Sequence, residues 1–307
     1  MIRHAARALR DQVVGRAAIA GLTLLSYLPE RLLLLVARAW GVIGPKVQSA
    51  RARWGAINLA RVYTFRDGAA PSAQTVARGV QQLFEHHLRF YIESARAPRH
   101  ARAIIATRVA LEDELAVAAA FTPSAGSAIF LAAHFGAIEL PGSILADRTG
   151  RTPIAPMEEI ANPVLQAWML RVRGAGLGLR IISAKGAAQV MSSELEAGGI
   201  VGMVADRNIV GAGVPVSLFG FSARLPISPA LLAVESGARL YVAAVVREPR
   251  GRYTGYLREV QIPEDGDRMA RTRVALAGIS RAFEELILKA PEQWWTLFYP
   301  IWDDLRV

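Results

Sequence analysis

The sequence predicts an α/β fold, in which a mostly parallel sheet is flanked by helices and preceded by an all-helical N-terminal portion. Beyond residue 126, short apolar segments alternate with segments whose apolar residues recur at helical spacing. Strands separated by helices of this length are typical of βαβ units, whose strands run parallel. The chain has 307 residues, enough to bury a substantial core, and we expect one main domain.

The first 45 residues predict two short apolar helices that lie in or dip into a membrane interface. The uncharged run from Ala17 to Pro29 covers 13 residues, about 20 Å as a helix, whereas the hydrocarbon core of a bilayer is about 30 Å thick. No convincing small-residue cleavage site follows the run, which argues against a cleaved signal peptide. The flanking basic residues, which suit an anionic surface, are Arg3, Arg7, Arg10, Arg16, Arg31 and Arg38. The alternative is a helical hairpin packed on the protein's own core.

The rest of the chain follows a regular order. Residues 72–97 predict a helix, because Val76, Val80, Leu83 and Phe84 recur on one side. The uncharged stretch 115–138 predicts a helix end, a turn and a buried strand. We expect strands at 127–133, 152–157, 178–183, 200–205, 239–248 and 253–262, and helices at 138–148, 162–174, 184–199 and about 268–290. Residues 214–226 are interpreted as an ordered loop. The expected division is a membrane-associating helical segment at 1–45 and an α/β domain at 46–307.

Composition narrows the classes of partner. The formal net charge is +10 and the sequence pI is about 10.6, which points to an anionic partner. The hydrophobic share of 52% favours a membrane over nucleic acid, so no nucleic-acid partner is expected. The chain contains no cysteine, which excludes disulfides, thiolate metal sites and a cysteine nucleophile.

His134 is the histidine with the strongest claim to chemistry among the five in the sequence. It ends a buried-strand pattern, and α/β sheets place reactive groups in the crevice beyond the carboxyl ends of their strands. Glu139 follows five residues later, so the two side chains could meet only across the intervening turn. Such a pair suits a general base and its orienting carboxylate, with backbone N–H groups at the next helix start as an oxyanion site. The spacing of His134 and Glu139 alone favours a structural role for His134 over a catalytic one. The other four are His4 in the basic terminus, His86 and His87 in a polar helix, and His100 in a basic loop.

A series of motifs adds to this interpretation. The segments "HFGAIE", "NPVLQAWMLRVRG", "VADRNIVGAGVPVSLFG", "PALLAVESGARLYVAAVVRE" and "PEQWWTLF" follow one another along the chain. Together they resemble the bacterial lipid A biosynthesis acyltransferase family, the late acyltransferase group that also includes the phosphatidylinositol mannoside acyltransferases of actinobacteria. The resemblance covers roughly residues 10–300. It implies a glycerolipid-acyltransferase-like α/β fold, a membrane-bound location and transfer of a fatty acyl group from a thioester to a lipid hydroxyl. It also implies that His134 and Glu139 are the catalytic histidine and its acidic partner.

Four further residues are candidates for the site. The resemblance implies that Asp206 is a catalytic acidic residue and places Arg171 where the family carries an arginine. Asp206 also follows a predicted strand, which could bring it beside His134; the alternative is a helix or turn cap. Arg171, Arg173 and Arg207 could grip a phosphate, although each alone is at least as well explained as a surface charge. At Arg207 and Asn208 the sequence departs from the aspartate-histidine-aspartate motif common among lipid A enzymes. Here it looks closer to the actinobacterial glycolipid enzymes.

Missing motifs narrow the chemistry further. The sequence has no HExxH motif, no acidic calcium loop, no P-loop and no GxSxG elbow, so we expect no cofactor and no catalytic metal. The sequence offers no obvious nucleophile that could form an acyl-enzyme. Direct attack of the acceptor hydroxyl on the thioester is therefore the simpler mechanism.

The function expected from the sequence is therefore acyl transfer at a membrane. The donor would be acyl-CoA or acyl-carrier protein, and the acceptor a hydroxyl of a glycolipid or phospholipid. The expected location is the cytoplasmic face of the bacterial inner membrane. One alternative is a thioesterase in which His134 activates water, and another is a catalytically inactive, basic membrane-binding protein.

Overall fold

The computed structural model describes residues 2–174, 176–208 and 213–306, with the backbone alone for residues 2–9. Its helices are α1 (Ile2–Tyr27), α2 (Glu30–Val47), α3 (Ser49–Asp67), α4 (Ala73–Arg108), α5 (Glu114–Ala120), α6 (Leu140–Thr149), α7 (Pro163–Arg173), α8 (Ala187–Glu196), α9 (Ser228–Ser236) and α10 (Arg268–Leu288). Its strands are β1 (Val109–Leu111), β2 (Ala128–Ala132), β3 (Ile154–Met157), β4 (Arg180–Ser183), β5 (Ile200–Val204), β6 (Val214–Leu218), β7 (Phe221–Leu225), β8 (Arg239–Arg247) and β9 (Tyr253–Val260). The predicted α/β class is confirmed.

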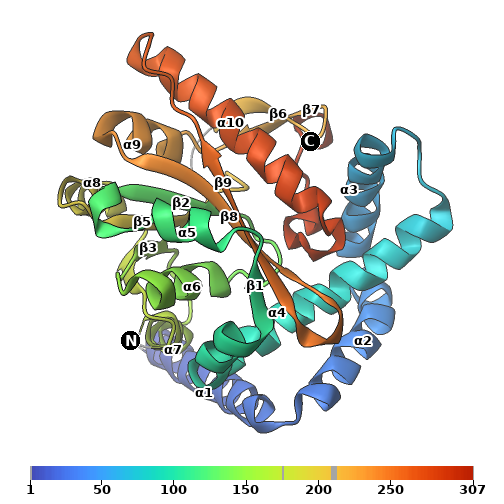
Figure 1. Cartoon of the computed structure of the whole chain (residues 1–307). Helices are drawn as coiled ribbons and strands as arrows, with labels where there is room; N and C mark the ends of the chain where they lie inside the picture. Colours follow the sequence, from blue (N-terminus) through green and yellow to red (C-terminus); the bar gives the residue numbers. More distant parts are fainter. Residues whose placement is uncertain (1, 175, 209–212, 307) are drawn as a thin grey trace.

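A seven-stranded sheet in the order β1-β9-β8-β2-β5-β3-β4 forms the centre of the described part of the molecule (Figure 1). Every neighbouring pair runs parallel except β8 and β9, which are antiparallel. β2 lies between β8 and β5, and all five of its residues are buried, as its continuous apolar run predicts. The carboxyl ends of β2 and β5 therefore lie side by side.

Helices cover both faces of the sheet. Ile129 and Leu131 of β2 belong to a core shared with α8, α9 and α10. Ala128 and Phe130, which alternate with them, pack with residues of α5 and α6 on the opposite face. This alternation along one strand places the sheet between two helical layers, visible in Figure 1.

α4 is longer than the helix predicted at 72–97. The side chain of Ser72 caps its first turn, and Pro98 lies inside the helix without ending it. The prediction that His100 lies in a basic loop is therefore wrong, because His100 is part of α4. Basic residues around Pro98 instead fasten the turn between α1 and α2. Arg96 donates to the carbonyl oxygen of Leu28 at 2.8 Å, and Arg99 lies 4.0 Å from the ring centre of Tyr27.

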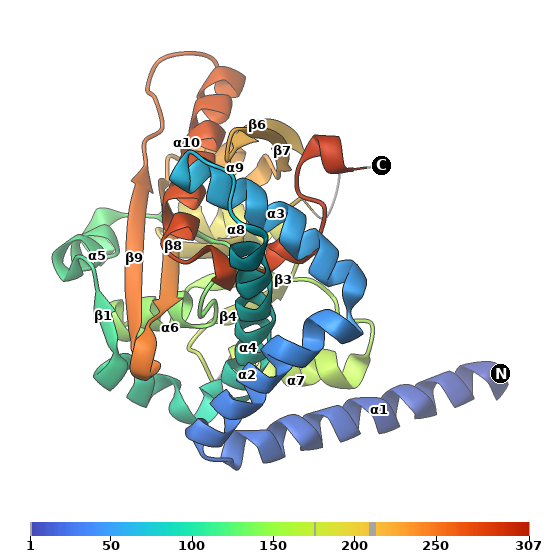
Figure 2. The same ribbon diagram turned by 90° about the vertical axis from the view of Figure 1, so that its right-hand side faces the viewer.

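The two N-terminal helices pack on the α/β part of the molecule. α1 contacts α7 and α4, and Figure 2 shows it running past both. α2 packs on α4 through the buried residues Leu33, Ala37, Gly41 and Gly44. The other side of α2 leaves large apolar side chains exposed, namely Leu32, Leu35, Val36, Val42, Ile43 and Val47. In the described residues, no helix has the length and apolar character needed to cross a bilayer. The side chains of Arg3, Arg7 and His4 lie outside the described part.

Residues 214–226 form a β-hairpin rather than the loop expected from the sequence. β6 and β7 pair antiparallel, and Phe219 and Gly220 connect them with φ values of 53° and 79°. A two-residue turn with positive φ at both positions matches the right-handed twist of a hairpin. Trp302 anchors the hairpin, since its indole N–H donates to the carbonyl oxygen of Leu218 at 2.7 Å.

Candidate active site

His134 lies just beyond the carboxyl end of β2, where the sequence predicted it. The chain turns sharply at Gly136, whose φ is 58°. A Cβ atom there would lie 2.1 Å from the carbonyl oxygen of Val245, so the turn requires glycine. The backbone N–H of Trp295 donates to the carbonyl oxygen of His134 at 3.1 Å, and that of Gly136 donates to the carbonyl oxygen of Gln293 at 3.2 Å. Residues 293–295 thus hold the turn on which the histidine stands.

The carboxylate that contacts His134 is Asp206. The Nδ1 atom of His134 and Oδ1 of Asp206 are 2.7 Å apart, and the side chain of Asp206 is 1% exposed. Both residues follow the carboxyl ends of adjacent parallel strands, β2 and β5. The expectation that Asp206 could lie beside His134 is confirmed by this contact. The bond occupies Nδ1 and leaves Nε2 for another partner.

Two donors hold the second oxygen of Asp206. The indole N–H of Trp294 and the hydroxyl of Thr296 donate to Oδ2 at 2.7 and 2.6 Å. Burial alone would raise the pKa of Asp206, but attraction to His134 and these hydrogen bonds outweigh it and lower the pKa to about 2. The carboxylate is therefore ionised and fixed in orientation. The sequence alone does not single out Trp294 or Thr296, although both belong to the quoted segment "PEQWWTLF".

Glu139 does not contact His134, so the expected pairing of these two side chains is wrong. Glu139 precedes the first residue of α6 and is buried. Its carboxylate accepts three hydrogen bonds from Arg173, the shortest at 2.8 Å, and one from the hydroxyl of Ser94 at 3.2 Å. The turn carries the side chains of His134 and Glu139 apart. The neighbouring strand β5 instead brings the carboxylate of Asp206 to Nδ1 of His134. Glu139 instead ties α6 to α7 and α4.

The three candidate arginines lie in different surroundings. Arg173 is engaged by Glu139, and Arg171 is exposed on α7 and does not line the cavity that contains His134. Arg207 follows Asp206 directly and lines that cavity. Its guanidinium lies 5.2 Å from the ring centre of Tyr299, and its Nε is buried without a hydrogen-bond partner. Arg207 forms no ion pair within the described part of the chain.

A cavity of about 730 Å³ opens beside His134. This volume is typical of a ligand pocket. Most of its walls are apolar or aromatic, and they come from Leu22 of α1, Phe90 and Tyr91 of α4, Trp168 and Met169 of α7, Met191 of α8 and Met203 of β5. The ring of Trp295 stands edge-on to His134, with ring centres 4.4 Å apart. The histidine therefore faces a space suited to an apolar substrate.

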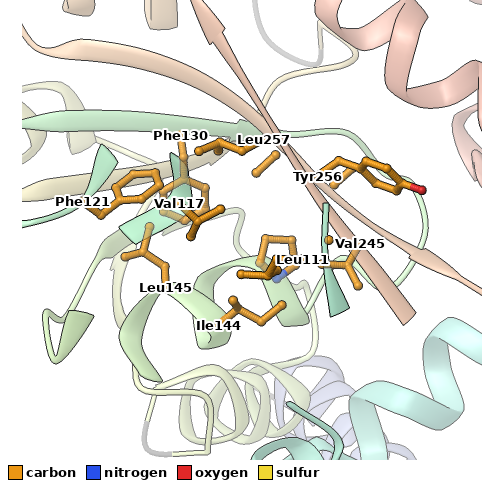
Figure 3. Close-up of a pocket in the computed structure, with 13 residues that line it drawn as sticks. Leu111, Val117, Phe121, Phe130, Ile144, Leu145, Val245, Tyr256 and Leu257 are labelled. Carbon is orange, nitrogen blue, oxygen red and sulfur yellow. The ribbon is translucent and has the colours of Figure 1, made fainter. Parts of the chain in front are cut away.

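Two smaller hollows, which His134 does not line, lie nearby; one of them is lined by Glu139 and Arg173 as well as by apolar side chains. One, of about 90 Å³, shares Ile138, Met157 and Met203 with the large cavity. The other, of about 40 Å³, lies between the sheet and the α5–α6 layer, as Figure 3 shows. Phe130 and Pro141 line both small hollows. The hollow of about 90 Å³ thus adjoins both the large cavity and the hollow of about 40 Å³.

His86, His87 and His100, the other histidines whose side chains the structure describes, do not line the cavity that contains His134. His87 packs against Tyr91, Trp295 and Phe298, and burial lowers its pKa to about 4. Burial also lowers the pKa of His86. No group of three or more His, Asp or Glu side chains in the described residues is placed to hold a metal ion.

Comparisons with known proteins bear on this geometry. A family model described as bacterial lipid A biosynthesis acyltransferase matches residues 4–302. A phosphatidylinositol mannoside acyltransferase of Mycobacterium tuberculosis is 31% identical over 129 residues, which is 40% of this chain. The match spans 40% of the length of that curated relative.

Proposed function

Because the chain belongs to the bacterial lipid A biosynthesis acyltransferase family, we propose that it transfers a fatty acyl group from a thioester to a hydroxyl of a glycolipid. The observation that carries the proposal is the hydrogen bond between His134 and the buried, ionised Asp206 at the edge of a large apolar cavity. The donor would be acyl-CoA or acyl-carrier protein. The partial match to a phosphatidylinositol mannoside enzyme supports a glycolipid acceptor, and another phospholipid hydroxyl is the broader form of the proposal.

In the proposed reaction, Nε2 of His134 removes the proton of the acceptor hydroxyl while that oxygen attacks the thioester carbonyl carbon. Asp206 keeps the proton on Nδ1 and stabilises the imidazolium that forms. When the tetrahedral intermediate collapses, the carbon–sulfur bond breaks and the imidazolium returns its proton to the leaving thiolate. The products are an ester and a free thiol, and no acyl-enzyme is needed.

The proposed oxyanion site narrows to a short stretch of backbone. The N–H groups of residues 135, 136, 137 and 140 already donate to carbonyl oxygens of the protein. Ile138 lines the cavity, and its N–H has no backbone acceptor within the described residues. We therefore assign stabilisation of the developing oxyanion to the N–H of Ile138 rather than to the whole helix start.

The acyl chain would occupy the apolar space beyond His134. The main cavity and the two smaller hollows provide consecutive apolar surfaces, ending between the sheet and α5–α6 (Figure 3). Phe130 stands between the two small hollows, and its ring would meet any side chain placed at Gly202. A chain that extends past Met203 would therefore have to pass this ring to reach the hollow between the sheet and α5–α6.

We also propose that α1 and α2 rest on the membrane interface rather than crossing it. The exposed apolar residues of α2 lie near the exposed Arg31 and Arg38, a combination suited to an anionic surface. Leu22 of α1 lines the cavity, so an acceptor lipid could enter from the side on which α1 lies. The location that we propose for this interface is the cytoplasmic face of the inner membrane.

The two alternatives are less well supported. A thioesterase needs room for an acyl thioester and a water molecule but none for an acceptor lipid, whereas the cavity of about 730 Å³ beside His134 also has Arg173 and Arg207 at its wall, which suits an anionic acceptor. An inactive binding protein has no need of a buried aspartate held by three donors. A phosphate-binding role for Arg207 remains part of the proposal, while Arg173 is engaged by Glu139.

The proposal is tested by lipid analysis combined with an assay of the purified protein. Mass spectrometry of lipids from cells with and without the gene product should reveal one acylated glycolipid that depends on it. That lipid's deacylated form is then offered to the pure protein with acyl-CoA or acyl-carrier protein. Acyl transfer that needs the acceptor supports the proposal, and release of free fatty acid at the same rate without acceptor supports the thioesterase instead.

A further inference from the structure

A second cavity is lined by Asp206 and Arg207. It has a volume of about 540 Å³ and shares Arg207 and Asn208 with the cavity that contains His134. Asp206 and Thr296 also line it, so it borders the carboxylate that contacts His134. Its remaining polar and aromatic lining includes Trp54, Arg224, Tyr299 and Arg306.

The charge of this second cavity is positive. Arg207, Arg224 and Arg306 line it. The carboxylate of Asp206 is already bonded to His134, Trp294 and Thr296. Asp303 forms an ion pair with Arg224 at 3.0 Å, and the charge of Arg306 also lowers the pKa of Asp303, whereas Arg207 forms no ion pair in the described residues. The buried Nε of Arg207 has no hydrogen-bond partner among the residues that the structure describes.

The walls of the second cavity come from distant parts of the chain that are fixed to one another. Asn58 of α3 donates to the carbonyl oxygens of Leu297 and Tyr299 at 2.8 and 2.7 Å. Trp302 forms a bridge with Ala223 of the β6–β7 hairpin. These bonds fix the backbone walls of the cavity before any ligand arrives, which lowers the cost of binding.

We infer that the second cavity binds the phosphate-bearing part of a substrate, with Arg207 and Arg306 as its cationic groups. Guanidinium groups bind phosphate through paired N–H donors, and an aromatic surface such as Tyr299 or Trp54 suits the adjoining organic group. The inference rests on the proposed function, because a substrate must reach from this cavity to His134. The phosphate belongs either to the donor, as in CoA, or to the head group of the acceptor lipid.

Calorimetric binding to the purified full-length protein in detergent tests the inference without turnover. The probes are CoA, phosphate-free pantetheine, and glycerophosphoinositol as an acceptor-type phosphodiester. The variant Arg207→Gln/Arg306→Gln removes two charges, and Arg273→Gln on the exposed face of α10 is the control, since Arg273 lines neither cavity. Circular dichroism checks folding, and the single Arg306→Gln at an exposed side chain repeats the measurement if the double variant misfolds.

A donor phosphate predicts that CoA binds wild type at least ~10-fold tighter than pantetheine does, and that this ratio approaches one in the double variant. An acceptor phosphate predicts the same arginine dependence for glycerophosphoinositol. If neither phosphate probe binds, or both bind the double variant and the control equally, the inference is wrong. Arginine-dependent binding by a protein that transfers no acyl group would keep the inference and reject the proposed function. Acyl transfer without arginine-dependent binding of either phosphate probe would reject the inference and keep the proposed function.

Discussion

Nδ1 of His134 lies 2.7 Å from Oδ1 of Asp206, although 72 residues separate them in the chain. The contact exists because β2 and β5 are parallel neighbours, so that both strands deliver a polar residue to the same edge of the sheet. The contact occupies Nδ1 of His134 and leaves Nε2 for the proton transfer that we propose.

Replacing either member of this pair should remove most of the activity. We expect His134→Ala to remain folded and to lower kcat by at least ~100-fold, the usual scale for loss of a general base. Asp206→Asn should lower kcat by a similar factor, because an amide can bind the wrong imidazole tautomer. Steady-state acyl transfer by the purified variants measures both effects. Near-normal turnover of His134→Ala would exclude the proposed mechanism.

The low pKa of Asp206 predicts how stability depends on pH. Its pKa is about 2 in the folded protein, against an ordinary value of 3.8. A carboxylate with a lowered folded pKa stabilises the protein above its unfolded pKa and loses that effect as pH falls through the folded value. The shift corresponds to about 2 kcal/mol. Urea unfolding of wild type and Asp206→Asn should therefore show a free-energy difference that shrinks between about pH 4 and pH 2. A difference that stays constant over this range would contradict the assigned pKa.

Thr296→Val should disturb Asp206 while keeping the shape of the side chain. The change removes the hydroxyl that donates to Oδ2 at 2.6 Å, so the pKa of Asp206 should rise and the acid loss of stability should begin at higher pH. Because the carboxylate is also held less firmly, we expect kcat to fall about 10-fold. Thr107→Val is the matched control, since that hydroxyl bonds within α4 at the carbonyl oxygen of Ala103. Equal behaviour of the two variants would show that Thr296 acts in packing alone.

Glu139 and Arg173 should be coupled in stability. Arg173 donates to both carboxylate oxygens of the buried Glu139, so Glu139→Gln weakens the bond between α6 and α7. We expect a coupling free energy of about 1–2 kcal/mol from a double-mutant cycle with Arg173→Gln, measured by denaturant unfolding. Turnover should fall in both single variants, because α6 begins directly after the His134 turn. Purely additive changes would mean that the pair contributes nothing as a pair.

Membrane attachment should depend on the exposed side of α2. Leu32, Leu35, Val36 and Ile43 are exposed, and burying them in a bilayer would resist salt, which screens charge attraction but not apolar contact. We expect wild type to stay with membranes in high salt and to be released by detergent. Serine at all four positions should make the protein largely salt-extractable. Deletion of residues 1–45 is a poorer experiment, because Ala18 and Leu22 line the active-site cavity. If wild type washes off quantitatively in salt, α1 and α2 serve the protein's own core alone.

Local sequence pattern was sufficient to predict β2 to β5, β8 and β9, together with α6 to α8 and α10. Strand and helix alternate beyond residue 126 with apolar periods that each segment carries by itself, and β2 is buried as its uncharged run indicates. The position of His134 and Asp206 at strand ends follows from the same pattern. The β6–β7 hairpin could have been recognised from Phe219–Gly220, since glycine is favoured where φ is positive.

The partner of His134 could not be predicted in this way. Glu139 is five residues away and Asp206 is 72, yet strand order decides which carboxylate arrives within hydrogen-bond distance. The donors from Trp294 and Thr296 likewise depend on how the C-terminal segment crosses the sheet edge. Pro98 was misleading for a related reason: packing against the rest of the protein keeps α4 helical through a residue that ordinarily disrupts helices.

The presence of Ala18 and Leu22 in the cavity wall has a kinetic consequence. The helix that would rest on the lipid surface is also one side of the reaction chamber, so adsorption and catalysis would share a single structural element. The rate would then follow the mole fraction of acceptor in the bilayer plane rather than its bulk concentration. Diluting the acceptor with inert lipid at constant total acceptor would slow the enzyme, whereas doubling the aqueous volume would not once all of the protein is adsorbed.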